Sequence, residues 1–261
     1  MSQRFRQPEI MELARREGRV TVDGLAEHFG VTVQTIRRDL TDLAETGKLE
    51  RVHGGAVLPS GVDNIGYEDR RVLNPSAKEA IAEAAAAAIP DGASVFLNIG
   101  TSTEAVARRL LTHRNLLAIT NNLNIANILA ANSACEVVVA GGLLRRTDGG
   151  LTGRLTIRAI EEFKVDYGVL GCSALDEDGD ILDFDLDEVG VSQTVLRRAR
   201  RRLLVADHSK FLRTAPGRIA SLAEIDAFFT DRPLPGRLAA RCMAWGTEVT
   251  ICTADEDIAA I

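Results

Sequence analysis

Two hydrophobic patterns divide the chain. In the first sixty residues, apolar side chains recur at helical spacing in short segments, and no long strand is indicated. From about residue 78 onward, apolar runs of four to six residues alternate with helical patterns, which predicts an α/β domain with a mainly parallel sheet. Residues 58–77 separate the two patterns and hold two prolines and two glycines without periodicity. We therefore expect a small α+β domain at 1–57, a linker at 58–77 and a Rossmann-like α/β domain at 78–261.

The first domain is predicted to contain three helices. A first amphipathic helix ends at Gly18, and a short extended piece at 20–22 follows it. Asp23 is expected to cap the second helix, which Gly30 closes, and Thr32 is expected to cap the third.

The third predicted helix has two distinct faces. Its apolar face carries Val33, Ile36, Leu40 and Leu43, and its opposite face carries Gln34, Arg37, Arg38 and Thr41. Two helices joined by a tight glycine-containing turn form a helix-turn-helix, which sets its second helix into the DNA major groove. Arginine and glutamine match base edges with paired hydrogen bonds, and threonine reaches phosphate or base. The simpler alternative is a solvated face on which the arginines pair with Asp39 and Asp42.

A basic hairpin is predicted directly after this helix. The sequence KLERVHGGAVL alternates in polarity and is expected to turn at Gly54-Gly55. Lys48, Arg51 and His53 would project from it as a wing over the DNA backbone. The order of caps, turn, apolar face and hairpin favours DNA binding, because a solvated helix explains none of it.

These residues carry a family resemblance. The stretch RREGRVTVDGLAEHFGVTVQTIRRDLTDLAETGKLERVHGGA resembles the N-terminal winged helix-turn-helix of the DeoR family of bacterial transcriptional regulators. The resemblance implies operator binding, with groove, phosphate and wing contacts from Thr32, Gln34, Thr35, Arg37, Arg38, Arg51 and His53.

Net charge looks at first like an argument against DNA binding. The 261 residues carry a formal net charge of −6, whereas nucleic-acid binders usually have a basic excess. Residues 1–60, however, carry nine basic and nine acidic side chains, so the whole excess falls on residues 61–261. The acidic total therefore describes the second domain only.

Several classes of protein are disfavoured by the sequence. The first eighteen residues are charged and lack an apolar core, so no signal peptide is expected, and no apolar run is long enough to cross a membrane. The four cysteines are scattered without a CxxC pair or neighbouring histidines, which disfavours a disulfide framework and a metal site. We expect a cytoplasmic protein with no membrane partner.

The first strand of the second domain is followed by a candidate phosphate cradle. Residues 94–110 predict a strand, a small-residue loop and a helix, with Gly100, Thr101, Ser102 and Thr103 at the helix N-terminus. Neither GK[ST] nor GxGxxG is present, so no nucleotide cofactor is expected. The alternative is an ordinary Ser/Thr helix cap.

Polar or glycine residues follow the later strands as well. They are Asn121 and Asn122, Gly141 and Gly142, Cys172 and Ser173, and Asp207 with Lys210. Ligands of open α/β sheets bind at the carboxyl ends of the strands. Amides that bond hydroxyl groups and a lysine that bonds phosphate together predict a small phosphorylated polyol as the ligand.

Residues 174–190 carry eight carboxylates. Their spacing does not match a calcium loop, so we expect a solvated hairpin turning at Asp178-Gly179, with Asp185 and Glu188 reaching the ligand. The arginine run at 197–202 ends a helix, and a second DNA contact there is left open.

From about Lys78 to Asp231 the chain resembles the DeoR effector domain, which has the fold class of ribose-phosphate isomerase and glucosamine-phosphate deaminase. The stretches NIGTSTEAVA, TNNLNIAN, AGGLLRRTDGGLTG and VADHSKF resemble a branch of the family that responds to glycerol 3-phosphate. The resemblance implies this effector, with the loop at 100–103 and Lys210 on the phosphate. Where the isomerases have an acid-rich catalytic stretch, this chain reads GCSA at 171–174, so a general base is missing.

The leading hypothesis is a transcriptional repressor that a phosphorylated small molecule releases from operator DNA. Symmetric half-sites would require a homodimer or homotetramer. One alternative is a repressor that responds to another sugar phosphate, and a less favoured one is a sugar-phosphate isomerase or deaminase.

Overall fold

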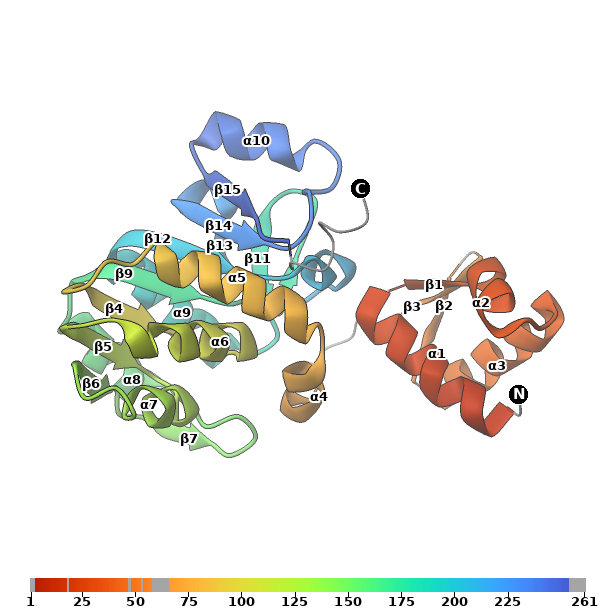
Figure 1. The fold of residues 1–261 in the computed structure, drawn as a ribbon, viewed down its shortest axis with the longest axis horizontal. Helices are drawn as coiled ribbons and strands as arrows, with labels where there is room; N and C mark the ends of the chain where they lie inside the picture. The colour runs from red at the N-terminus through yellow and green to blue at the C-terminus, as the bar shows by residue number, and fades with distance from the viewer. Residues whose placement is uncertain (1–2, 18, 47, 53, 58–65, 254–261) are drawn as a thin grey trace. The chain divides into compact units, whose positions relative to one another are not determined.

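The computed structural model describes residues 3–17, 19–46, 48–52, 54–57 and 66–253. The chain divides into two compact units, residues 1–63 and 64–261 (Figure 1). Each unit has its own hydrophobic core.

The N-terminal unit is a winged helix-turn-helix. Its elements are α1 (Gln3–Glu17), β1 (Arg19–Thr21), α2 (Val22–Phe29), α3 (Val33–Glu45), β2 (Glu50–Val52) and β3 (Gly55–Val57). The three strands form an antiparallel sheet in the order β1-β3-β2. The core between the helices holds Ile10 of α1, Leu25 of α2, and Ile36, Leu40 and Leu43 of α3.

Helix caps fix the entry into α2 and α3. Thr21, rather than the predicted Asp23, caps α2, because its hydroxyl accepts a hydrogen bond from the Gly24 amide at 3.1 Å. Gly30 ends α2 in the left-handed conformation (φ 61°), and Thr32 caps α3, both as predicted.

The hairpin pairs one residue earlier than predicted. Val52 lies opposite Gly55, so Gly55 belongs to β3 rather than to the turn. A Cβ atom on Gly55 would lie 1.9 Å from the carbonyl oxygen of Val20. Gly55 is therefore needed for the close approach of β1 to β3, a requirement that the hairpin pattern alone does not show.

A seven-stranded parallel sheet forms the centre of the C-terminal unit. Its strands are β4 (Ser94–Leu97), β5 (Leu116–Thr120), β6 (Cys135–Val139), β9 (Val165–Leu170), β12 (Ala199–Val205), β14 (Ala227–Thr230) and β15 (Glu248–Ile251). Their order is β15-β14-β12-β9-β4-β5-β6, so the direction of winding reverses between β4 and β9. Ligands bind at such a switch point in open α/β sheets.

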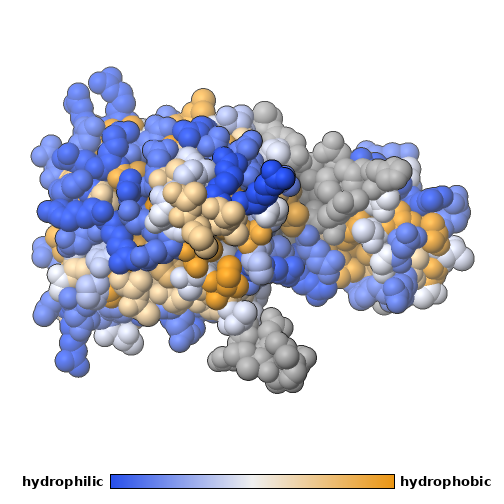
Figure 2. All heavy atoms as spheres, turned by 90° about the horizontal axis from the view of Figure 1, so that it is seen from above, coloured by the Kyte–Doolittle hydropathy of each residue, from blue (hydrophilic) through white to orange (hydrophobic). Residues whose placement is uncertain are grey.

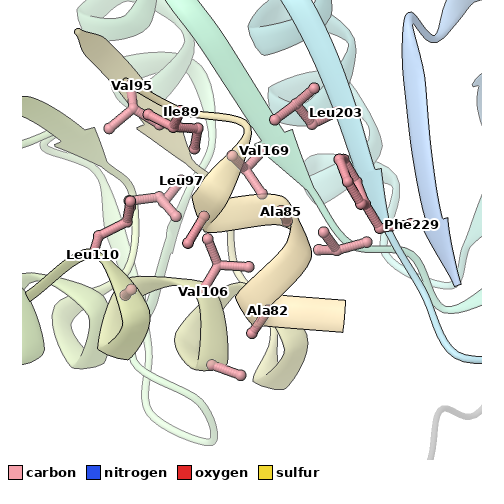
Figure 3. Close-up of a cluster of buried hydrophobic side chains, with 14 of the residues drawn as sticks. Ala82, Ala85, Ile89, Val95, Leu97, Val106, Leu110, Val169, Leu203 and Phe229 are labelled. Atoms are coloured by element: carbon pink, nitrogen blue, oxygen red, sulfur yellow. The ribbon is translucent and has the colours of Figure 1, made fainter. Parts of the chain in front are cut away.

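Helices cover both faces of the sheet (Figure 1). Those packed on one face are α5 (Pro75–Ala87), α6 (Thr101–Arg109) and α7 (Leu123–Leu129), and those on the other are α8 (Arg154–Glu161), α9 (Leu186–Arg198) and α10 (Leu238–Trp245). Figure 3 shows Val95 and Leu97 of β4 packed with Val106 of α6 and Ala85 of α5. Phe96, between these two valine and leucine positions, lies in the opposite core, as strand alternation requires.

Smaller elements surround the strand ends. Short 3₁₀ helices cover Leu110–Thr112, His208–Leu212 (η2) and Leu222–Glu224. The antiparallel strands are β7 (Leu143–Arg145) with β8 (Gly150–Thr152), and β10 (Ala174–Leu175) with β11 (Asp180–Asp183) and β13 (Gly217–Ser221). The β10–β11 pairing confirms the acidic hairpin, and Gly179 at its turn has φ 87°.

The predicted linker contains a helix. Residues Tyr67–Val72 form α4, and α5 begins at Pro75. The sequence at 58–77 carries no apolar repeat that would predict α4, because a six-residue helix is too short to display one.

The described part of the chain contains no helix that is long and apolar enough to span a bilayer. Hydrophilic residues predominate on the face visible in Figure 2, with smaller hydrophobic areas between them.

A buried ion pair ties α1 to α3 in the N-terminal unit. The guanidinium of Arg6 donates to both carboxylate oxygens of Asp39, at 2.8 and 3.3 Å, and the two residues are 6% and 1% exposed. We expect Asp39→Ala to lower the unfolding free energy of this unit by ~3–5 kcal/mol, because Arg6 would lose its buried carboxylate partner.

Denaturant unfolding followed by circular dichroism measures this effect. Asp23→Ala, at an exposed position of α2, is the matched control and should change stability by less than about 0.5 kcal/mol. Equal stability of the two variants would contradict the role given to Asp39.

Candidate functional site

The solvent-facing side of α3 is polar and basic. Gln34, Arg37, Arg38 and Thr41 are exposed, whereas Ile36 and Leu40 on the opposite side are fully buried. The structure therefore presents the four side chains on one surface, as the helical spacing predicted.

Arg37 and Arg38 have uncommitted guanidinium groups. No hydrogen bond or ion pair of either side chain is found within the described residues. Asp39, which could have neutralised them, is turned inward to Arg6. The interpretation of a salt-bridged, solvated face therefore loses its main acceptor, and two cations remain available for DNA.

Thr32 and Thr35 define the start of α3. The Thr32 hydroxyl accepts from the Thr35 amide at 3.3 Å and lies 2.9 Å from the Thr35 hydroxyl. These threonines lie at the helix end whose amides attract phosphate.

The wing is attached to α3 by Arg51. Its Nη1 donates to the carbonyl oxygen of Arg37 at 3.0 Å and lies 3.5 Å from the hydroxyl of Thr41. Arg51 thus positions β2 against α3. Its side chain is also exposed, as is that of Lys48, three residues earlier. His53 lies outside the described residues.

A pocket lies at the switch point of the C-terminal sheet. It is lined after β4 by Ile99, Gly100, Thr101 and Ser102, after β9 by Gly171, Cys172 and Ser173, and from other segments by Arg70, Asp183, Glu188 and Lys210. Neighbouring parallel strands end at the same edge, so their loops converge there.

The N-terminus of α6 forms one wall of the pocket. Gly100 precedes the helix with φ 152°, and no side chain caps the helix start. Thr101 and Ser102, in the first turn, line the pocket. Uncapped amides at a helix N-terminus favour an anion.

Four cationic side chains surround this wall. Arg70, Lys78, Lys210 and Arg213 interact electrostatically with one another or with Asp207. Within the described residues, Nε of Arg70, both terminal nitrogens of Arg213 and the hydroxyl of Ser209 are buried without a hydrogen-bond partner. Buried donors of this kind are normally satisfied, so these unpartnered groups, of which Arg70 lines the pocket, favour an oxyanion as the ligand.

The crowding of positive charge lowers the proton affinity of the lysines. Burial, reinforced by Arg213, lowers the pKa of Lys210 to about 8, and burial, reinforced by Lys210, lowers that of Lys78 to about 8. Burial would raise the pKa of Asp207, but Lys210 and hydrogen bonds from Ser209 and Asn74 hold it at about 2. Asp207 is thus a charged partner of the lysines.

Carboxyl groups form the other side of the pocket. Burial and the neighbouring Asp183 raise the pKa of Glu188 to about 8, although Arg145 opposes this shift. Arg145 holds Asp148, Asp185 and Glu188 together through contacts of 2.5–2.6 Å. Asp183 accepts from the hydroxyl of Ser173 at 2.9 Å. A cationic wall opposite carboxyl groups suits a molecule with an anionic end and a hydroxylated end.

The structure distributes the predicted pocket residues between two roles. Gly100, Thr101, Ser102, Glu188 and Lys210 line the pocket. The other predicted residues, Thr103, Asn121, Asn122, Gly141, Gly142, Asp185 and Asp207, are not among its lining residues. Apart from Gly142 and Oδ1 of Asn121, they form hydrogen bonds within the protein.

The two asparagines show what residues outside the pocket lining do in this structure. Asn121 Nδ2 donates to Leu151 O at 3.0 Å, and Asn122 caps α7 while donating to Asp148 O. The Nδ2 groups of both amides hold the segment that carries β8, while Oδ1 of Asn121 is buried without a hydrogen-bond partner within the described residues. Gly142 has φ 154°, and a Cβ there would lie 1.9 Å from the hydroxyl of Thr156, so this glycine serves packing.

Sequence reasoning missed Arg70, Lys78, Asp183 and Arg213. Asp183 follows the general rule of polar strand-end residues, but it was one of eight similar acids. Arg70 lies in a segment without periodicity, and its place at the pocket depends on how α4 folds back.

The arginine run at 197–202 is engaged within its own unit. Its acceptors are Thr194 for Arg197, Phe163 O for Arg198, Asp166 for Arg200, Glu248 for Arg201 and Asp226 for Arg202. These contacts favour a structural role at the start of β12, opposite the pocket end of the sheet.

Comparisons with known proteins agree with this division of the chain. The family model of the DeoR-like helix-turn-helix domain matches residues 6–62, and that of the DeoR C terminal sensor domain matches residues 73–232. The chain is 45% identical over 235 residues to the glycerol-3-phosphate regulon repressor of Escherichia coli (strain K12), covering 90% of this chain and 93% of that protein. It is 40% identical over 252 residues to the HTH-type transcriptional repressor CsqR of the same organism, covering 97% and 96%.

Among solved structures, ribose 5 phosphate isomerase A from Neisseria gonorrhoeae aligns with 52% of this chain and 53% of that chain, at 14% identity and a TM-score of 0.37. This likeness is too weak to support an argument.

The lowered pKa values predict that anion binding depends on pH. Lys78 and Lys210 carry their charges below about pH 8 and lose them above it, so the affinity for inorganic phosphate should fall about 10-fold between pH 7.5 and 9. Calorimetric titration measures this dependence.

Lys210→Arg is the matched variant, because a guanidinium stays charged over this range and should flatten the profile. Affinity that is constant or rises with pH in the unaltered protein would contradict the assignment of these lysines.

Proposed function

The chain belongs to the DeoR family of bacterial transcriptional regulators, and we propose that it is a repressor that binds operator DNA through its N-terminal unit and releases it when a phosphorylated small molecule occupies the switch-point pocket. The observation that carries the second half of this proposal is a pocket lined by the uncapped start of α6 together with Arg70 and Lys210, with Nε of Arg70 buried and unpartnered within the described residues. The exposed face of α3 carries the first half.

The DNA-binding role is supported by what α3 leaves exposed. Gln34, Arg37 and Arg38 offer donors suited to base edges and phosphates, and the wing adds Lys48 and Arg51. His53 is included in the wing from the family resemblance. The surface is small for one copy, so a homodimer or homotetramer that reads two half-sites supplies the affinity.

Glycerol 3-phosphate is the proposed effector. Two relatives that each cover most of the chain are named glycerol-3-phosphate regulon repressors. The pocket chemistry fits this class, because a phosphate suits the cationic wall and vicinal hydroxyls suit Asp183 and Glu188. Another sugar phosphate is the alternative effector, since CsqR, a repressor with a different printed name, is also similar.

The relatives compared above are repressors rather than enzymes. No cofactor enters the proposal. The chemistry required of the pocket is reversible binding with unequal affinity for the two states of the protein.

Removing the α3 arginines should weaken DNA binding selectively. We expect Arg37→Ala or Arg38→Ala to lower affinity for a duplex selected by the unaltered protein about 10- to 100-fold, corresponding to ~1–3 kcal/mol per contact. Fluorescence anisotropy measures the DNA affinity, and calorimetry should show unchanged effector binding.

Arg158→Ala, which removes an exposed arginine of α8, is the control and should leave DNA affinity unchanged. Loss of both DNA and effector binding in the α3 variants would indicate a folding defect and contradict the assignment.

Removing the pocket lysine should weaken effector binding selectively. Lys210→Ala should lower affinity for glycerol 3-phosphate at least about 10-fold, because a charge-assisted hydrogen bond contributes ~1.5–3 kcal/mol. Lys164→Ala removes an exposed lysine of the same unit and should have no effect. Heat of binding with fructose or tagatose phosphates, and none with glycerol 3-phosphate, would replace the proposed effector by another sugar phosphate.

A further inference from the structure

Helix α4 connects the pocket to the DNA-binding unit along the chain. It is the first described element after residues 58–65, and it lies at the N-terminal end of α5 in Figure 1. A six-residue helix does not stay folded by itself, so its position depends on its contacts with the rest of the C-terminal unit. Val72 at its end is 74% exposed, whereas Leu73, which follows the helix, is buried.

The side chain of Arg70 reaches the pocket from α4. It lines the pocket, its Nη2 lies 3.6 Å from Asp148 Oδ2, and its Nε is buried without a hydrogen-bond partner among the described residues. Asp148 already receives two shorter contacts from Arg145, at 2.6 and 2.9 Å. Arg70 is therefore weakly held, and a bound oxyanion would offer it a better partner than Asp148 does.

The main chain of Arg70 is held by two groups that belong to the anion site. Its carbonyl oxygen accepts hydrogen bonds from Nζ of Lys78 and, at 3.4 Å, from the hydroxyl of Thr101. Lys78 is one of the four cations, and Thr101 lines the pocket. An oxyanion in the pocket competes with this carbonyl for both donors.

Tyr67 provides the second attachment of α4. Its hydroxyl donates to Glu104 of α6, at 3.0 Å, and accepts from Nδ2 of Asn124 of α7, also at 3.0 Å. None of these three residues lines the pocket. An oxyanion therefore competes for contacts at the Arg70 end of the helix and not directly for those of Tyr67.

We propose that α4 is the element that transmits effector binding to the DNA-binding unit, with Arg70 as the residue that senses the anion. The anion draws Arg70 away from Asp148 and competes for the donors of Lys78 and Thr101. As a result, α4 shifts its position against α6 and α7. Residues 58–65 join this helix to the N-terminal unit along the sequence, so a shift of α4 displaces the point at which the connection starts. This inference rests on the proposed function and assigns the route of regulation.

The two states differ in a defined set of contacts, which allosteric coupling requires. In the ligand-free state, which is the state that binds DNA, α4 is held by contacts of Arg70, Lys78, Thr101 and Tyr67. In the ligand-bound state, the first three contacts are exchanged for contacts to the anion. Coupling of this kind typically changes affinity 5- to 150-fold, and the factor is the same for effector and DNA.

The test compares DNA affinity of the full chain without effector and with saturating glycerol 3-phosphate. The probe is a duplex selected by the unaltered protein from a random pool. The unaltered protein should lose at least about 10-fold in DNA affinity. In Arg70→Ala, saturating effector should lower DNA affinity by only about one third of that factor or less, because the sensing side chain is absent. Arg71→Ala, whose exposed side chain lies 3.7 Å from Glu68, should respond like the unaltered protein.

Saturation separates sensing from binding. If Arg70→Ala responds with the full factor once enough effector is present, Arg70 only contributes to affinity and the inference is overturned. If the unaltered protein shows no response, the proposed function itself fails.

Tyr67→Phe supplies an independent arm that leaves the pocket intact. Losing the hydroxyl loosens α4, so DNA affinity without effector should fall about 3-fold or more, and effector affinity should rise because the effector-binding state becomes more populated. Thermal unfolding of each variant checks that the fold is retained. Unchanged affinities for both partners in Tyr67→Phe would also overturn the inference.

Discussion

The reversal of winding between β4 and β9 is the constraint on which the ligand pocket depends. Because the two strands are parallel neighbours, the loops that follow them leave the sheet at the same edge and on opposite faces. One loop brings the uncapped start of α6 to the pocket, and the other brings the small residues at 171–173. The cations and carboxyl groups that complete the pocket come from segments packed over this edge, so their placement follows from the sheet order.

A comparable constraint organises the N-terminal unit. The buried pair of Arg6 and Asp39 turns one acidic residue of α3 toward α1, and the apolar face of α3 fills the same core. Arg37 and Arg38 remain exposed, and Asp39 is not available to neutralise them. Arg51 then fastens the wing to the helix, so that the two basic elements present one surface.

Both units use burial of charge for different purposes. In the N-terminal unit, the buried ion pair is complete and stabilises the helices that display the DNA-binding face. In the C-terminal unit, buried cationic donors are left incomplete, which costs stability unless an anion binds. Burial also lowers the pKa values of Lys78 and Lys210, as expected for cations removed from water. The helix α4 shares the same donors, which places the connection between units within the reach of the ligand.

Local periodicity and turn chemistry determined the winged helix-turn-helix, the parallel α/β class, the acidic hairpin and the cradle at 100–103, because each depends on residues close together in the chain. The sequence could not distinguish Asn121 and Asn122, which bond to the backbone, from Ser173 and Asp183, which lie at the pocket. All four follow strands, and only the packing of β7, β8 and β11 decides which of them remain accessible. The contribution of Arg70 was equally hidden, because α4 has no periodic signal and reaches the pocket only through contacts with residues distant in sequence. Side-chain identity therefore set the available chemistry, and tertiary packing decided which polar groups bond within the protein and which remain for a ligand.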